Sequence, residues 1–162
     1  MKILVATDGS DFSKAAIAEL TNIVANPENT AFKIVSTVEY PTMLASDPFI
    51  GASAEYYDAV EKAGHEQARA AAEQVETQIR LLFPEVSLNI ISEAVSGSPQ
   101  RVLVEEATEW GADLIVVGSH GYGFWEHALL GSVSNSVVNH APCSVLVVRP
   151  AKAADKSKIK NF

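Results

Sequence analysis

Five short runs of β-branched and other apolar residues punctuate the chain, and they constrain its fold more than any other feature. Several of these runs are almost continuously apolar instead of alternating, which is typical of strands buried on both faces of a parallel sheet. We therefore predict a parallel sheet of five strands. The predicted strands are Lys2–Ala6, Phe32–Val38, Ser87–Ile91, Asp113–Val117 and Ser144–Val148.

Helical patterns separate the predicted strands. Two of them carry apolar residues at helical spacing and stop before a proline. A third begins with Ser98 and Pro99, a capping hydroxyl followed by proline at the first helical position, and ends at Gly111. Strands that alternate with helices predict an α/β fold, a single doubly wound, five-stranded parallel sheet with helices on both faces. The predicted helices cover residues 16–24, 68–82, 98–110 and 132–140.

Length and composition favour one globular domain over residues 1–150. The chain has 162 residues, of which 48% are hydrophobic, so it can bury a core of its own. No apolar run approaches the ~18 residues that a membrane span requires, and the first residues do not resemble a signal peptide. The single cysteine, Cys143, excludes an internal disulfide framework, so we expect a cytoplasmic protein. Residues 151–162 hold four lysines and one aspartate, and we expect them to form a flexible tail.

The chain is strongly acidic outside this tail. Its formal net charge is −8, and the +3 of the tail leaves −11 for residues 1–150. An acidic body does not attract nucleic acid or an anionic membrane, so we expect neither as a partner. Acidity of this kind generally serves solubility. Any bound phosphate must therefore be held by local geometry.

Two of the predicted strands end in polar segments that contain glycine. The first runs into Thr7, Asp8 and Gly9, and the fourth runs into a glycine-rich loop over residues 118–131. In an open α/β sheet, ligands bind beyond the carboxyl ends of the strands, where the strand order reverses. The predicted helix after the loop begins at Ser132, and the first amides of a helix have no internal partners and attract anions.

Taken alone, the glycine-rich loop leaves two interpretations open. Gly118 and Gly121 allow the backbone to turn sharply and to approach a ligand, but glycine-rich loops also serve as plain connections. The sequence has neither a P-loop nor the GxGxxG turn of dinucleotide-binding proteins. No Lys or Arg occurs between Gly118 and Ser134, so phosphates held there would depend on amides, hydroxyls and a divalent cation.

Four segments of the chain resemble the universal stress protein family. They are residues 3–10 (ILVATDGS), 95–99 (VSGSP), 112–121 (ADLIVVGSHG) and 142–148 (PCSVLVV). The similarity extends from Lys2 to about Arg149. It implies a Rossmann-like fold of the adenine nucleotide alpha hydrolase type.

Members of this family that bind ATP carry the pattern G-x2-G-x9-G-[ST], which this chain matches from Gly118 to Ser132. The resemblance implies ATP, with Mg2+ or Mn2+ bound through its phosphates. It assigns the ribose and phosphates to Gly118, Gly121, Gly131, Ser132, Val133 and Ser134. It assigns the adenine and ribose side to Ala6, Thr7 and Asp8, although family binders often have proline where Ala6 stands. It places Val38 against the base and makes Val117 a wall residue before the loop. We expect Gly118→Val and Gly131→Val to abolish ATP binding while the fold remains soluble.

We expect a regulatory module of the stress response that binds ATP and signals its presence to an unidentified protein partner. A slow metal-dependent ATP hydrolase that uses Asp8 is the alternative, and a scaffold or chaperone-like protein with an empty pocket is a further one. Catalysis by Ser119 and His120 is disfavoured, because sequence neighbours rarely meet in the required geometry and no GxSxG elbow is present. The protein is therefore expected to be at most a weak ATPase.

Two further segments suggest contacts with partners. The last predicted strand, Ser144–Val148, is apolar, and an open apolar edge promotes association. The resemblance implies a homodimer in which this strand pairs with its copy. The connection over residues 39–54 is unusually long for an α/β unit, and we expect it to act as a lid or a partner surface. Its apolar residues include Met43, Leu44, Phe49 and Ile50.

Overall fold

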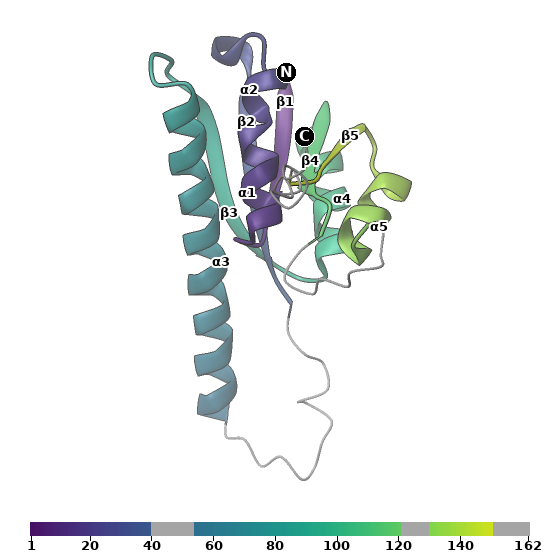
Figure 1. The fold of residues 1–162 in the computed structure, drawn as a ribbon. Coiled ribbons are helices and arrows are strands. Elements are labelled where there is room, and N and C mark those ends of the chain that lie inside the picture. The colour runs from purple at the N-terminus through teal and green to yellow at the C-terminus, as the bar shows by residue number, and fades with distance from the viewer. Residues whose placement is uncertain (40–53, 121–129, 151–162) are drawn as a thin grey trace, which may run out of the picture.

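The computed structural model describes residues 1–39, 54–120 and 130–150 of the chain. These residues form one five-stranded sheet with the strand order β3-β2-β1-β4-β5, in which all neighbouring strands run parallel. Figure 1 shows helices on both faces of this sheet. The predicted doubly wound α/β fold is confirmed.

Strands and helices alternate along the chain as the sequence predicts. The strands are β1 (Lys2–Thr7), β2 (Ala31–Val38), β3 (Asn89–Ser96), β4 (Leu114–Gly118) and β5 (Ser144–Val148). The helices are α1 (Asp11–Ala18), α2 (Leu20–Ile23), α3 (Ala54–Leu82), α4 (Pro99–Trp110) and α5 (Ser132–His140), with a 3-10 helix at Pro27–Asn29. Gly111 ends α4 as predicted, because it adopts the left-handed conformation (φ 68°, ψ 52°) that glycine takes without strain.

Two apolar clusters hold the layers together, one on each face of the sheet. The first joins the sheet to α1, α2 and α3 through side chains such as Ile3, Phe32 and Ile79. The second joins the sheet to α4 and α5 through side chains such as Leu4 and Leu103. Ile3 and Leu4 belong to different clusters because successive side chains of a strand point to opposite faces. This alternation decides which strand residues can reach a site on either face.

Strand β3 extends beyond the apolar run that predicts it. The run stops at Ile91, but the strand continues to Ser96 and pairs with β2 over its whole length. Polar residues are tolerated in the extension because β3 lies at an edge of the sheet. The Ser92 hydroxyl donates to a Glu76 carboxylate oxygen of α3 at 2.5 Å. This bond, with further hydrogen bonds from Arg80, holds the pKa of Glu76 below its usual range.

The first predicted helix begins earlier than expected and is divided in two. Helix α1 begins at Asp11, and Glu19 separates it from α2. Ser10 caps α1, because its hydroxyl accepts a hydrogen bond from the Ser13 amide at 3.4 Å. The short turn between β1 and α1 brings the start of α1 against the end of β4, as the contact between Phe12 and Gly118 described below shows.

Some expectations concern residues outside the described ranges. These are the long connection after β2, Gly121 of the glycine-rich loop, and the lysine-rich tail. None of the described helices is both long enough and apolar enough to cross a membrane. Helix α3 has 29 residues, but charged side chains are distributed along it.

Candidate functional site

The strand order of the sheet reverses between β1 and β4. From β1 the sheet continues through β2 and β3 on one side and through β4 and β5 on the other. Open α/β sheets bind ligands at such a point, beyond the carboxyl ends of the strands. A cavity of about 280 Å3 lies there. It is lined by Ala6, Thr7, Asp8, Ser13, Val35, Thr37, Pro99, Leu103, Val117, Gly118, His120, Gly131, Ser132, Val133 and Ser134.

One end of the cavity is apolar and belongs to the face of the sheet that α4 and α5 cover. Val35, Leu103 and Val117 form part of the apolar cluster on this face, and each is at most 2% exposed. Ala6 packs against the same cluster, and Pro99 begins α4 beside it. This end of the cavity therefore suits a flat, apolar ring.

Hydrogen bonds from its own side chains hold the turn between β1 and α1 in place. Asp8 Oδ1 accepts a hydrogen bond from the Ser10 amide at 2.9 Å, and Thr7 Oγ1 accepts one from the Gly9 amide at 3.1 Å. The Thr7 hydroxyl donates to Ser13 Oγ at 3.2 Å. Gly9 has a φ of 81°, a conformation that favours glycine. The turn therefore presents the exposed Asp8 carboxylate to the cavity in a defined orientation.

The start of α5 forms the other end of the cavity. Gly131 occupies the N-cap position and brings no side chain to the first amides of the helix. The Gly131 amide donates to the Ser119 carbonyl oxygen at 2.7 Å, and the Ser134 hydroxyl donates to the same oxygen at 3.0 Å. These bonds hold the helix start against the end of β4. A helix start in this position attracts anions, because its amides and the helix dipole both favour negative charge.

Gly118 is required by the packing of α1 against β4. A Cβ atom at this position would lie 2.8 Å from the carbonyl carbon of Phe12 and 2.9 Å from its oxygen. Gly131 is less constrained, because a Cβ atom there would lie 3.3 Å from its nearest neighbours, in His120 and Ser119. The expectation that Gly118→Val leaves the fold intact is therefore revised, since the added side chain would meet the backbone of α1.

Ser119 and His120 do meet, although sequence neighbours rarely do. Ser119 Oγ lies 3.2 Å from His120 Nδ1. Ser119 is fully buried, with no exposed surface, so its hydroxyl is not presented to a ligand in the cavity. His120 lines the cavity, and its ring centroid lies 5.3 Å from that of Phe12. This arrangement does not favour a nucleophile.

The structure brings most of the site residues predicted from the sequence together around one cavity. Val38 is not among the residues that line it. Val38 follows Phe32 and Ile34 at two-residue spacing, so its side chain lies on the α3 face, where a Cβ atom at Gly64 would lie 3.0 Å from it. Gly121 lies outside the described residues. The predicted residues that line the cavity are Ala6, Thr7, Asp8, Val117, Gly118, Gly131, Ser132, Val133 and Ser134.

Several lining residues were missed by the sequence analysis as parts of this site. Val35 and Thr37 lie on the same face of β2, one position out of phase with Val38, and the two-residue alternation would have found them once that face was known. Pro99 and Leu103 come from the first turns of α4, four residues apart on one side of the helix. The remaining missed residues are Ser13 and His120.

Little charge lines the cavity. Among the described residues, its lining includes one carboxylate, from Asp8, one imidazole, from His120, and no Lys or Arg. In the part of the chain that the structure describes, no three His, Cys, Asp or Glu side chains are grouped to hold a metal ion. A phosphate at the start of α5 would therefore be bound by amides and hydroxyls.

Comparisons of the sequence with known proteins identify relatives over nearly the whole chain. The Universal stress protein family matches residues 1–149. The chain is 32% identical over 152 residues to a universal stress protein of Methanocaldococcus jannaschii, which covers 93% of this chain and 83% of the relative. It is 34% identical over 152 residues to a putative universal stress protein of Staphylococcus aureus strain USA300, with coverage of 91% and 82%.

Solved structures have the same fold. The fold is similar to universal stress protein UspA from Lactobacillus plantarum, with a TM-score of 0.72, 24% identity, and coverage of 92% of this chain and 97% of that one. A universal stress protein in complex with cAMP has a TM-score of 0.65, 26% identity, and coverage of 93% and 98%. A universal stress protein family protein from Arabidopsis thaliana with AMP bound has a TM-score of 0.65, 20% identity, and coverage of 99% and 97%. The chain therefore belongs to the universal stress protein family.

Proposed function

We propose that this protein binds ATP, with Mg2+ or Mn2+ on the phosphates, and acts as a nucleotide-dependent regulatory module of the stress response. The observation that carries the proposal is the cavity between β1 and β4, whose two ends differ in chemistry. One end is apolar, and the other is the start of α5. A nucleotide has the same polarity, because a flat base stands at one end and anionic phosphates stand at the other.

The parts of the nucleotide are assigned to the cavity by this polarity. The base lies between the apolar side chains of Val35, Leu103 and Val117, and the ribose lies near the Asp8 carboxylate, which accepts hydrogen bonds from hydroxyls. The phosphates lie at the amides and hydroxyls of residues 131–134, and Gly121 completes the motif. The universal stress protein solved with cAMP, 26% identical to this chain, supports a nucleotide as the ligand class.

A divalent cation fits the chemistry of the phosphate end. Mg2+ prefers oxygen ligands and is commonly held by one or two protein groups together with phosphate oxygens. The Asp8 carboxylate and the Ser132 hydroxyl supply oxygens at the cavity, but they do not form a complete ligand set. We therefore assign the metal to the nucleotide's phosphates. It neutralises their charge there, because no Lys or Arg is among the described residues that line the cavity.

Slow metal-dependent ATP hydrolysis is the second candidate function, and it rests on the presence of Asp8 and His120 in the cavity lining. Hydrolysis needs a residue that orients water in line with the terminal phosphate. Asp8 Oδ1 already accepts the Ser10 amide, and His120 Nδ1 lies at the buried Ser119 hydroxyl. These contacts favour positioning roles for both residues. We therefore favour binding over turnover.

Nucleotide analysis of the purified protein tests the proposal directly. Heat release is expected to yield intact ATP, and calorimetric titration of the emptied protein with ATP and Mg2+ is expected to show one site per chain. Incubation with ATP is expected to show turnover near background. If neither ATP, AMP nor cAMP binds, the proposal is wrong and a scaffold role is favoured. Binding of AMP or cAMP without ATP would retain a nucleotide site and reject ATP as its ligand.

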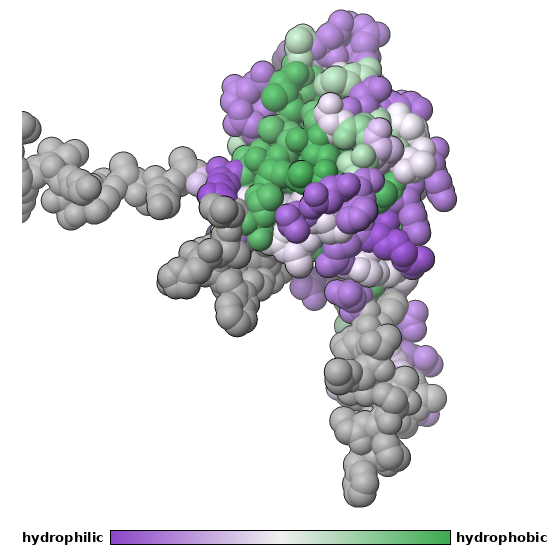
Figure 2. Space-filling model, turned by 90° about the vertical axis from the view of Figure 1, so that its right-hand side faces the viewer, coloured by the Kyte–Doolittle hydropathy of each residue, from purple (hydrophilic) through white to green (hydrophobic). Residues whose placement is uncertain are grey.

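We also propose that two copies of the chain associate through β5. In the described residues β5 pairs only with β4, so its outer edge is open. Its residues Val145–Val148 are only partly buried. Figure 2 shows apolar side chains gathered in one patch on the side of the molecule that carries β5 and α5. An open apolar edge of this kind is a template for pairing with a strand of another chain.

Val147→Pro is expected to convert the dimer to a monomer. The Val148 carbonyl accepts the Ser119 amide of the neighbouring segment at 2.8 Å, so the polar backbone groups of Val147, one residue earlier, point to the open edge. Proline removes the amide that pairing across this edge needs and leaves the bonds to β4 in place. Light scattering is expected to give twice 17.3 kDa for the unaltered protein and for Val147→Thr, which keeps the amide. A monomeric unaltered protein would contradict the assembly.

A further inference from the structure

Arg149 directly follows β5 and lies close to Ser119, the residue that follows β4. In the register of the sheet, Gly118 of β4 lies opposite Val148 of β5. The Ser119 amide continues this pairing, because it donates to the Val148 carbonyl oxygen at 2.8 Å. The carbonyl of the same Ser119 accepts the Gly131 amide at 2.7 Å. Arg149 is thus connected through Ser119 to the start of α5.

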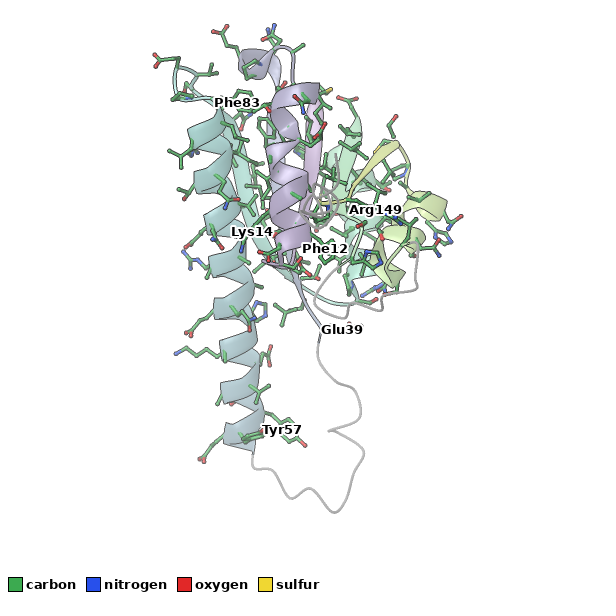
Figure 3. The ribbon with its side chains drawn as sticks, in the orientation of Figure 1. Phe12, Lys14, Glu39, Tyr57, Phe83 and Arg149 are labelled. Carbon is green, nitrogen blue, oxygen red and sulfur yellow. The ribbon has the colours of Figure 1, made fainter. Side chains whose placement is uncertain are left out.

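The alternation of β5 decides the face from which the Arg149 side chain leaves the sheet. Val145 and Val147 pack into the cluster with α4 and α5, whereas Leu146 and Val148 pack into the cluster on the opposite face. The next position in this alternation returns to the α5 face. Helix α5 runs antiparallel to the strands, so its first residues stand at the same end of the sheet as Arg149. Figure 3 labels Arg149 on the α5 side of the molecule.

Arg149 is also an available cation. Its side chain is exposed, and it forms no ion pair among the described residues. Lys14, near the start of α1, pairs with Asp11 at 3.0 Å, and Arg101 in the first turn of α4 pairs with Glu105 at 3.5 Å. Arg149 is therefore the cation in this region of the described structure that no carboxylate already holds.

We infer that Arg149 binds the phosphates of the nucleotide from outside the cavity and favours ligands with more phosphate charge. The inference rests on the proposed nucleotide site and deepens it. The residue does not line the cavity, but an arginine side chain is long, and its planar guanidinium donates paired hydrogen bonds to phosphate oxygens. Phosphates that extend beyond the α5 amides come within reach of the Arg149 guanidinium. Arg149, directly after β5, thus supplies the positive charge that residues 118–134 lack.

The test compares ATP, AMP and adenosine in calorimetric titrations of the unaltered protein, Arg149→Ala, Arg149→Lys and Arg69→Ala. Arg149→Ala is expected to weaken ATP about ten-fold, the usual effect of losing a hydrogen bond to a charged group. Its affinity for adenosine is expected to remain unchanged. The affinity of Arg149→Lys for ATP is expected to lie between those of Arg149→Ala and the unaltered protein, because lysine keeps the charge without the paired geometry. Arg69→Ala removes an equal charge from α3, where Arg69 pairs with Glu73 at 2.8 Å, and is expected to have no effect.

Each outcome of these titrations bears on the inference. An Arg149→Ala protein that binds ATP as tightly as the unaltered protein would overturn the inference and leave the proposed function standing. An equal loss of affinity for ATP and for adenosine would also overturn the inference, because such a loss would indicate a structural effect of the substitution. Failure of the unaltered protein to bind any of the three ligands would overturn the proposed function and this inference together. Light scattering of Arg149→Ala checks that its assembly state is unchanged.

Discussion

Gly118→Val is expected to destabilise the fold by about 3 kcal/mol or more, the upper range for forcing extra atoms into a packed interior. Any Cβ atom at residue 118 would lie within 3 Å of the Phe12 carbonyl group, and real Cβ atoms essentially never approach backbone that closely. The start of α1 would have to move away from the end of β4. Denaturant unfolding, with the midpoint followed by far-UV circular dichroism, measures the effect. Loss of ATP binding would accompany the loss of stability as a consequence of it.

Gly131→Ala is the matched control for this prediction. Gly131 adopts φ −69° and ψ 163°, which any residue can take, and an added Cβ atom would lie 3.3 Å from its nearest neighbours. The neighbouring backbone must shift by a few tenths of an ångström. We therefore expect a smaller change in the free energy of unfolding than for Gly118→Val, with a measurable loss of ATP affinity at the α5 amides. If Gly118→Val unfolds at the same denaturant concentration as the unaltered protein, the packing argument is wrong.

The parallel sheet could be predicted because its central strands are buried on both faces. Leu4 and Val5 in β1, and Ile115 and Val116 in β4, have no exposed surface, so the sequence shows them as uninterrupted apolar runs. Strand β3 has no such constraint, because none of the described strands pairs with its outer edge and its polar residues bond to α3 and β2. An apolar run therefore marks only its first residues, as far as Ile91. The length of an edge strand depends on tertiary partners that local pattern does not reveal.

The residues of the cavity also differ in whether the sequence alone could predict them. Gly131, Ser132 and Ser134 could be placed because they belong to a motif with fixed spacing. Val35 could not, because β2 is apolar on both faces in this region, and only the packing of α4 shows which face looks into the cavity. The steric need for glycine at residue 118 was equally hidden. It comes from α1, more than a hundred residues earlier in the chain.

Removal of divalent metal is expected to weaken ATP binding by about ten-fold or more, because a bound cation supplies several kcal/mol of stabilisation to phosphate charge. Adenosine affinity should stay the same, since adenosine carries no phosphate. The cavity has no lysine or arginine among its described lining residues, and residues 1–150 carry a net charge of −11. Amides at a helix start contribute only about 0.3–1 kcal/mol each under exposed conditions. That contribution alone is too small to hold a triphosphate in an acidic protein.

Calorimetric titrations in EDTA, in Mg2+ and in Mn2+ measure this effect. Adenosine serves as the control ligand, because a chelator that harmed the protein itself would lower the affinity for adenosine as well. Arg149→Ala extends the experiment, since the cation and the guanidinium neutralise the same phosphates. Loss of both should lower the affinity for ATP more than either loss alone. If Arg149 were remote from the site, its replacement should add nothing to the effect of EDTA. If ATP binds equally well with and without the chelator, amides, hydroxyls and Arg149 are sufficient, and the metal has no part in the site.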